Sequence, residues 1–418
     1  MIGAERRRLI GRLEALVSTG SPGLYRVLAF LCVQHVYSLA DLGRTASSMA
    51  IAQMVGFFTA IGWATLILVR LPAAQNPRAG IDSFYALAFQ GALTTLVCTL
   101  GAALVGVGLA RFVHFDFWSF LSLLWGWTAY QIARHYFIAY KRYRTAIFFD
   151  GGLVLVSAAA LVICRKVGIS SSHALAIASL LVSLPMFAAV GAPSLKSIRL
   201  GIDAKGIQFG LTNFLSGGIP LVFVPTATVM CGAKFAGMLS LLASLSSVGM
   251  LLPRAISVTK LPELAARRSS GLALDGTLHA MRVSIARSNG LVSLINAAAV
   301  FVVALQKTPD PSMRWAAVIA GMLLTVLCAV GIMGLVNSNA LAVFEKAASA
   351  ASINVATTSL FVLLFAACAH LGGTHGFFLV LISAIAVTAL RNELIRAGAK
   401  AACTDYRSSL HGGAEVVQ

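Results

Sequence analysis

The sequence predicts an all-α polytopic membrane protein with twelve transmembrane helices in two six-helix lobes. Hydrophobic residues make up 58% of the 418 positions and charged residues only 11%, about half the charged fraction of a soluble domain. The mean hydropathy is +0.87, and apolar segments of spanning length recur along the chain. These segments lack the roughly ten-residue alternation of an outer-membrane barrel, so helices are expected.

Twelve apolar segments are long enough to cross a bilayer, and they follow one another with short connections. The longest predicted connection is 258–286, and every predicted outward-facing loop is short, which leaves little room for a catalytic domain outside. The predicted spans are 22–40, 46–70, 83–110, 117–139, 145–164, 172–192, 207–230, 235–257, 287–305, 314–336, 348–369 and 374–396.

The basic residues alternate between the two sides of the predicted membrane. Of the 32 Lys and Arg, 23 belong to the N-terminal segment, the even-numbered loops and the C-terminal tail, and seven to the odd-numbered loops. Cytoplasmic loops are enriched in Lys and Arg, so both termini are expected in the cytoplasm. This topology signal accounts for the net charge of +18 without a nucleic-acid partner, and it predicts attraction to anionic membrane lipids.

The predicted domain organisation follows a weak internal repeat. Residues 46–72 and 236–262 align without gaps, and both end in a basic residue followed by Leu-Pro. Such repeats are common in transporters, with the substrate site between the halves. The predicted parts are a cytoplasmic amphipathic segment at 1–21, an N-lobe at 22–205, a C-lobe at 206–396 and a cytoplasmic tail at 397–418. The basic stretch PSLKSIRLGIDAKG joins the lobes.

Three arginines lie on polar faces of spans one, four and eight, toward the cytoplasmic side: Arg26, Arg134 and Arg254. An ionisable side chain within a membrane is costly and usually faces a cavity or a partner. Guanidinium groups bind phosphate bidentately, so three of them in one wet cavity would hold a lipid-borne diphosphate. The alternative is that each arginine lies near a span end and extends to the headgroups.

Further polar side chains are candidates for the same cavity, and two carboxylates are candidates for coupling. Asp41 and Asp150 would couple transport to a H+ or Na+ gradient, or else are ordinary helix-end carboxylates. No cofactor or metal is expected, and no phosphate-binding loop for a nucleotide is present. The other cavity candidates are Gln34, Tyr37, Tyr130 and Asn213.

Span seven, QFGLTNFLSGGIPLVFVPTATV, is predicted to be bent and to act as a hinge. Gly217, Gly218, Pro220 and Pro225 all lie within it. Glycine and proline weaken or remove backbone hydrogen bonds, and such irregular backbone is tolerated in a membrane where it lines a cavity or moves.

Two segments resemble the Wzx-type polysaccharide flippases of the MATE-like MOP superfamily. YSLADLGRTASSMAIAQMVGFFTAIGWATLILVRLP is similar to the loop and second span of that family, with Gly43, Gly62 and Arg70 at its typical positions. SLLASLSSVGMLLPRAISVTKLPELA is similar to the eighth span. Related lipid II flippases carry essential arginines in spans one and eight, where Arg26 and Arg254 occupy similar places.

The resemblance implies two six-helix lobes around a cationic central cavity. The implied activity is translocation of an undecaprenyl-diphosphate-linked oligosaccharide from the inner to the outer leaflet of a bacterial plasma (inner) membrane, for exopolysaccharide or O-antigen synthesis. Other membrane proteins of polysaccharide assembly are the implied partners. The chain departs from the pattern of that family in being short and in having a sparsely charged second half.

Two other classes of protein remain open. A multidrug or cation antiporter of the same superfamily would need acidic residues in its cavity, and only Asp41 and Asp150 are suitable. A membrane glycan polymerase would need a substantial outward loop, and QKTPDPSMR at 306–314 is short. The arginine-rich set of candidates favours an anionic substrate and a transporter, not an enzyme.

Overall fold

The chain is described by a computed structural model that covers residues 2–74, 76–109, 116–194, 203–307, 310–344 and 346–415. Within these ranges every regular element is a helix, so the predicted fold class is confirmed. Residues 195–202, most of the basic stretch predicted to join the lobes, lie outside the described ranges.

Each of the twelve predicted spans lies largely within one or more helices. Among the described residues, nine helices are individually long and apolar enough to cross a membrane, and the bent pair α8–α9 makes a tenth. The other two predicted spans lie in α1 and α5. The 23 residues of α5 are of spanning length, but their many aromatic and polar side chains reduce their hydropathy.

The chain divides into two compact units, and the boundary between them in the sequence falls between Leu241 and Leu242, within α10. The spans predicted to open the C-lobe pack with the first unit, α8 on α3 and α9 on α2. The lobe boundary at 205/206, drawn from the internal repeat, stays a prediction.

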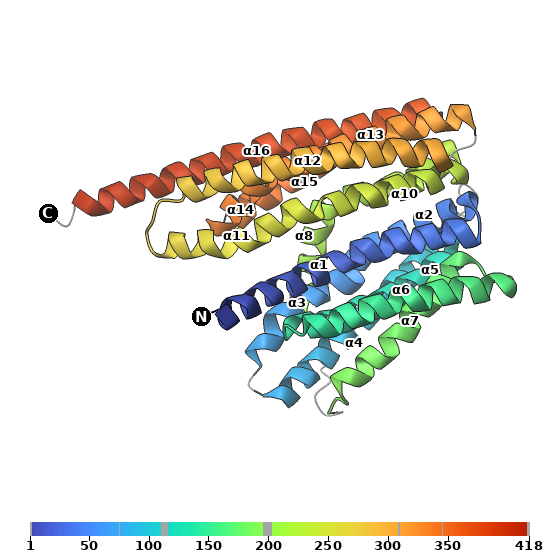
Figure 1. The fold of residues 1–418 in the computed structure, drawn as a ribbon, viewed down its shortest axis with the longest axis horizontal. Helices are drawn as coiled ribbons and strands as arrows, with labels where there is room; N and C mark the ends of the chain where they lie inside the picture. The colour runs from blue at the N-terminus through green and yellow to red at the C-terminus, as the bar shows by residue number, and fades with distance from the viewer. Residues whose placement is uncertain are drawn as a thin grey trace. The chain divides into compact units, whose positions relative to one another are not determined.

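The first unit is built around α5, which contacts α2, α3, α4 and α7, while α1 packs along α6 (Figure 1). This central position explains why α5 buries polar side chains instead of presenting apolar ones to lipid. The elements that begin in this unit are α1 (Ile2–Val36), α2 (Leu39–Gly56), the π-helical turn η1 (Phe57–Ile61), α3 (Gly62–Arg70), the 3-10 turn η2 (Leu71–Ala73), α4 (Pro77–Leu109), α5 (Phe117–Ala139), α6 (Tyr143–Lys166), α7 (Ser171–Val190), α8 (Ala204–Gly217), α9 (Ile219–Cys231) and α10 (Ala233–Gly249).

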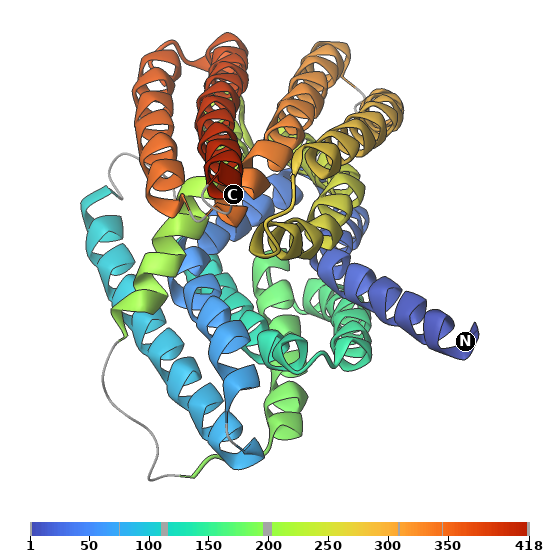
Figure 2. The ribbon, with the colours of Figure 1, turned by 90° about the vertical axis from the view of Figure 1, so that its left-hand side faces the viewer.

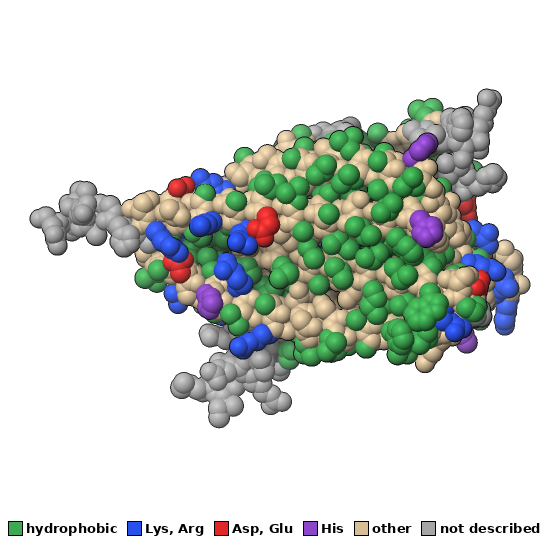
Figure 3. Space-filling view, turned by 90° about the horizontal axis from the view of Figure 1, so that it is seen from above, with side chains coloured by type: hydrophobic (Ala, Val, Ile, Leu, Met, Phe, Trp, Pro, Cys, Tyr) green, Lys and Arg blue, Asp and Glu red, His purple; other side chains and the backbone are tan. Residues whose placement is uncertain are grey.

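The second unit packs α13 against α12 and α16, and α15 lies beside α16 (Figure 2). The middle of the face seen in Figure 3 is apolar, and charged side chains gather toward its two ends. This pattern suits helices whose middle segments face lipid. The helices that begin in this unit are α11 (Leu251–Ser269), α12 (Asp275–Lys307), α13 (Pro311–Met333), α14 (Leu335–Val343), α15 (Ala347–Ala369) and α16 (Gly373–Glu415).

The connections differ from the sequence-based boundaries in three places. The N-terminal segment and span one form a single helix, α1, that runs through Pro22. The predicted connection 258–286 is mostly helical, because α11 continues to Ser269 and α12 begins at Asp275. Apolar side chains of these helices form a buried cluster with α14 and α16, which stabilises helix beyond the apolar segments that marked the spans. The described part of the tail continues α16 to Glu415.

Glycines allow two close helix contacts in the first unit. A Cβ added to Gly62 of α3 would collide with the carbonyl oxygen of Gly206 in α8. A Cβ on Gly43 of α2 would collide with Ala233 at the start of α10, and one on Gly237 would collide with Leu39. Such approach of backbones at small residues is a common way to pack helices where no hydrophobic effect operates between them.

Replacing Gly62 by alanine should destabilise the protein, because the α3–α8 backbones cannot separate without losing other contacts. Overpacking of this kind costs about 1–3 kcal/mol. Thermal unfolding of the detergent-solubilised chain measures the effect.

The matched control is Gly151→Ala in α6, where an added Cβ meets nothing within 4 Å. Alanine is the better helix former by about 0.5–1 kcal/mol, so this variant should melt at the same or a higher temperature. If Gly62→Ala melts like its control, the close contact between α3 and α8 is wrong.

Candidate functional site

A buried ion pair joins α5 to α6 in the first unit. Nε of Arg134 lies 3.0 Å from Oδ1 of Asp150, and the two side chains are each 4% exposed. A second guanidinium nitrogen of Arg134 donates to Oδ2 of Asp150 at 3.2 Å. The arginine therefore contacts both carboxylate oxygens, the geometry in which a guanidinium–carboxylate pair is strongest.

Helix α1 and the hydroxyl of Tyr130 complete this charge cluster. Arg134 also donates to the carbonyl oxygen of Ser18 in α1. Tyr130 of α5 and Ser21 of α1 donate their hydroxyls to the two oxygens of Asp150. A buried charge is tolerated only when its hydrogen-bonding capacity is met, and here three helices meet it together.

Arg134 and Asp150 contact each other, so their charges are paired in this structure. Each neutralises the other, so neither is available as a free ion to a substrate. The pair instead fixes α1 and α6 against α5. Their predicted roles in substrate binding and ion coupling stay predictions, and each would require the pair to open.

Arg26 differs from Arg134 because no carboxylate neutralises it among the described residues. Its Nε is buried and has no hydrogen-bond partner there. The guanidinium carbon lies 5.5 Å from the centre of the Phe30 ring, one turn further along α1. A cation over an aromatic face gains some electrostatic stabilisation and keeps its full charge. Arg26 is thus a candidate for binding an anion.

Arg254 and Asn213, the candidates in spans eight and seven, are not buried. Arg254 is exposed near the start of α11, and it forms no ion pair with the described residues. Asn213 is half-buried in α8, and its amide donates to the carbonyl oxygen of Phe209 at 2.9 Å.

Three candidates lie near the junction of α1 and α2, and two of them, Asp41 and Tyr37, have hydrogen-bond partners. Asp41 accepts hydrogen bonds from Ser38 at 2.6 Å and from Arg44 at 2.8 Å. Tyr37 donates to the carbonyl oxygen of Ile169 at 2.9 Å. Gln34 is half-buried, and it has no hydrogen-bond partner among the residues described. Ser38 is the N-cap of α2, and Asp41 lies in the first turn of that helix, where a carboxylate is stabilised by the helix dipole.

The irregular segment of span seven bends the helix. Helix α8 ends at Gly217, α9 begins at Ile219, and the two are inclined by 64°. Pro220 is in the first turn of α9, and Pro225 lies within that helix. The bend lies at the predicted glycine pair, while movement about it, the hinge role, stays a prediction.

The second unit contains a polar contact that the sequence analysis did not single out. Nε of Arg391 in α16 donates to the side-chain oxygen of Asn354 in α15 at 2.6 Å. Arg391 lies within the predicted span 374–396. An arginine and an asparagine inside neighbouring apolar spans were the signal that could have identified this contact.

Comparisons with solved structures identify the fold. Over 96% of this chain and 99% of the other, the structure is similar to a multidrug resistance MATE transporter of the MOP superfamily in an inward-facing conformation, with a TM-score of 0.65 and 12% identity. The eukaryotic MATE transporter AtDTX14 matches over 96% and 99% of the two chains, with a TM-score of 0.58 and 15% identity.

A third similar structure is a MOP superfamily transporter from Pyrococcus furiosus, described by a reverse polarity of its binding pocket that suggests a different function. It matches over 95% of both chains, with a TM-score of 0.59 and 13% identity. No protein-family model and no curated protein matches the sequence. The chain therefore has the fold of MATE transporters of the MOP superfamily.

Replacing Arg134 by alanine should destabilise the protein strongly, since Asp150 would be left as a buried charge without its partner. Breaking such a pair from one side costs about 3–5 kcal/mol. Replacing both residues, Arg134→Ala with Asp150→Ala, should restore part of this loss. Thermal unfolding of the single and double variants measures the coupling, and fully additive losses would contradict the ion pair.

Proposed function

We propose that this chain is a flippase that moves an undecaprenyl-diphosphate-linked oligosaccharide from the inner to the outer leaflet of a bacterial plasma membrane. Both termini would be cytoplasmic. The proposal unites the transporter fold, the residues that resemble Wzx-type flippases and the charges of the candidate site. Substrate binding would use Arg26 and Arg254, and other membrane proteins of polysaccharide assembly would deliver and remove the lipid.

The charge balance of the candidate residues is the observation that carries the proposal. Asp41 and Asp150, the two carboxylates suited to a cation site, each contact an arginine. Arg26 has a buried Nε without a partner among the described residues. A guanidinium in this state favours an anion, whereas a cationic substrate would find no free carboxylate at these positions.

Alternating access would move the substrate. The similar solved structures include MATE transporters described as inward-facing and outward-facing, so this fold supports both states in related proteins. In this chain the bend between α8 and α9 would change as the cavity opens to the other side. A H+ or Na+ gradient would drive the change if Asp150 or Asp41 released its arginine.

A multidrug or cation antiporter is the second candidate function, and the fold itself favours it. Several of the similar structures are described as multidrug transporters. The Pyrococcus transporter, with its pocket of reverse polarity, indicates that the same fold also serves other substrates. The buried Nε of Arg26, which has no partner among the described residues, supports the anion-binding alternative.

Replacing Arg26 by alanine should abolish export of surface polysaccharide in a bacterial strain that depends on this chain. Loss of a hydrogen bond to a charged group removes about 1.5–3 kcal/mol, a reduction of roughly 10- to 100-fold. Arg26→Lys should be only partly active because an ammonium cannot bind phosphate bidentately. The measurements are surface polysaccharide, accumulated lipid-linked oligosaccharide and protein level.

The control variant is Arg396→Ala, which removes an exposed arginine of α16 and should leave export unchanged. Full activity of both Arg26 variants at normal protein level would show that Arg26 is only a headgroup anchor. The anion-cavity proposal would then be wrong.

A further inference from the structure

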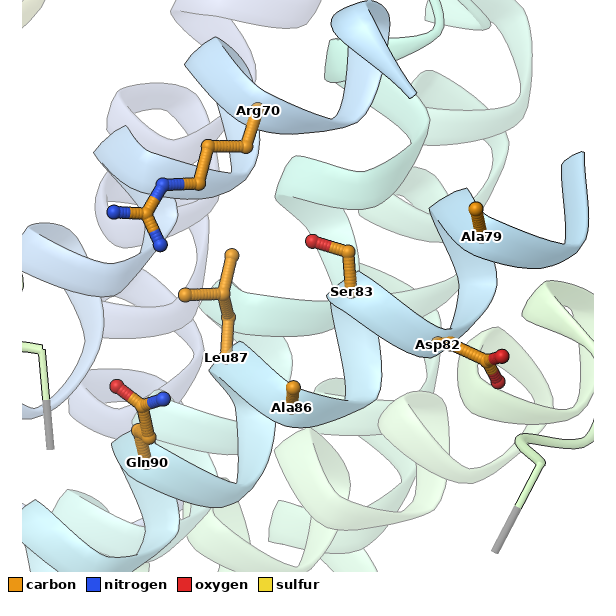
Figure 4. Close-up of a pocket in the computed structure, with 7 residues that line it drawn as sticks. All are labelled: Arg70, Ala79, Asp82, Ser83, Ala86, Leu87 and Gln90. Atoms are coloured by element: carbon orange, nitrogen blue, oxygen red, sulfur yellow. The ribbon is translucent and has the colours of Figure 1, made fainter. Parts of the chain in front are cut away.

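A polar cavity in the first unit lies apart from the arginines discussed above. It has a volume of about 460 Å³ and lies between the end of α3 and the first half of α4. Figure 4 shows the side chains that line it. They are Arg70, Ala79, Asp82, Ser83, Ala86, Leu87 and Gln90.

Arg70 is held at this cavity by the residue that precedes α8. One guanidinium nitrogen of Arg70 donates to Asp203, and this hydrogen bond lowers the pKa of the Asp203 carboxyl. The Asp203 backbone N–H in turn donates to Oε1 of Gln90 at 3.0 Å. Asp203 thereby fixes the guanidinium of Arg70 and the amide of Gln90 on the same side of α4.

The polar groups that line the cavity on the side of Arg70, and that have no partner among the described residues, are hydrogen-bond donors. Arg70 has five N–H donors, and Asp203 is its one hydrogen-bonded partner among the described residues. Gln90 is 7% exposed. Its oxygen accepts from Asp203, and its amide N–H groups have no partner within the described ranges, so they can donate to a ligand. The Ser83 hydroxyl also lacks a partner in the described part of the chain, and Figure 4 shows it pointing toward the side of Arg70.

The acidic group of the lining is turned away from these donors. Figure 4 shows the Asp82 carboxylate on the opposite side of α4, where it accepts the backbone N–H of Ser194 at 2.8 Å. Asp203 pairs with Arg70, so Arg70 contributes the N–H groups that Asp203 does not use. Together with the Ser83 hydroxyl and the Gln90 amide N–H, they suit the several acceptor oxygens of a phosphate group.

The face of α4 that lines the cavity becomes an exposed apolar stripe further along the helix. Ser83, Gln90, Val97 and Leu104 follow one another at seven-residue intervals, which places them on one helix face. Val97 is 58% exposed and Leu104 is 78% exposed. Gln90 and Leu104 are about 21 Å apart along the helix axis, close to the length of an extended acyl chain.

We propose that this cavity binds the phosphate headgroup of an anionic phospholipid, with Arg70, Ser83 and Gln90 as its donors. The acyl chains lie along the apolar stripe of α4 that begins at Val97. A polar cavity continuous with a lipid-facing stripe fits an amphiphile better than a soluble anion. This inference does not depend on the substrate proposed above.

Native mass spectrometry of the detergent-solubilised full chain tests the site, with added phosphatidylglycerol as the probe. Diacylglycerol with the same chains and glycerol phosphate without chains are the matched ligands. The wild-type protein should retain phosphatidylglycerol and neither of the others. Arg70→Gln should weaken retention about tenfold, as expected for a lost charge-assisted contact.

Two further variants keep the test decisive if Arg70→Gln folds poorly. Gln90→Glu retains the acceptor for the Asp203 N–H and places a negative charge on the phosphate side, so retention should fall at least as far. Arg78→Gln is the control, since it removes the same charge from an exposed position of α4 outside the cavity, and retention should stay within about twofold.

Three results would overturn the assignment. The first is equal retention of phosphatidylglycerol by the wild-type protein and by Gln90→Glu. The second is binding of glycerol phosphate as tight as that of phosphatidylglycerol, which would make the site one for a soluble anion. The third is displacement of phosphatidylglycerol by equimolar undecaprenyl diphosphate, which would assign the cavity to a polyprenyl lipid.

Discussion

The first unit depends on the buried contact between Arg134 and Asp150. An unpaired charge at this depth would be too costly to keep, and a single hydrogen bond would not be enough. The contact therefore involves three helices: the guanidinium from α5, the carboxylate from α6, and a carbonyl and a hydroxyl from α1. The position of α1, and with it that of Arg26, follows from this requirement.

The same contact determines which charges remain for a substrate. Pairing removes the acid that would most readily attract a cation, and Arg44 does the same for Asp41. Among the residues that the structure describes, Arg26 contacts the ring of Phe30 and no carboxylate, so it keeps its positive charge. The fold is that of MATE transporters, and the proposal of an anionic substrate rests on the distribution of paired and unpaired charges.

Composition and loop charge were sufficient to predict the twelve helical segments, because a bilayer permits few other structures for apolar stretches of this length. Composition and loop charge did not predict which side chains pair with one another. Nothing in the sequence of the turn between α5 and α6 indicates that Arg134 and Asp150 contact each other. Arg70 and Asp203 are 133 residues apart. Helical periodicity gives the face on which a side chain lies, but it does not identify the residue of the neighbouring helix that the side chain contacts. The helices within 258–286 were missed because cytoplasmic helices packed on one another need no long apolar run.

The most direct test of the account is a translocation assay with the purified chain in proteoliposomes. The substrate is a labelled undecaprenyl-diphosphate-linked oligosaccharide placed in the leaflet that corresponds to the cytoplasm, and a glycosidase on the other side reports its arrival. The account predicts that the label crosses, and that a cationic dye loaded in parallel vesicles is not exported. Export of the dye without movement of the lipid would contradict it.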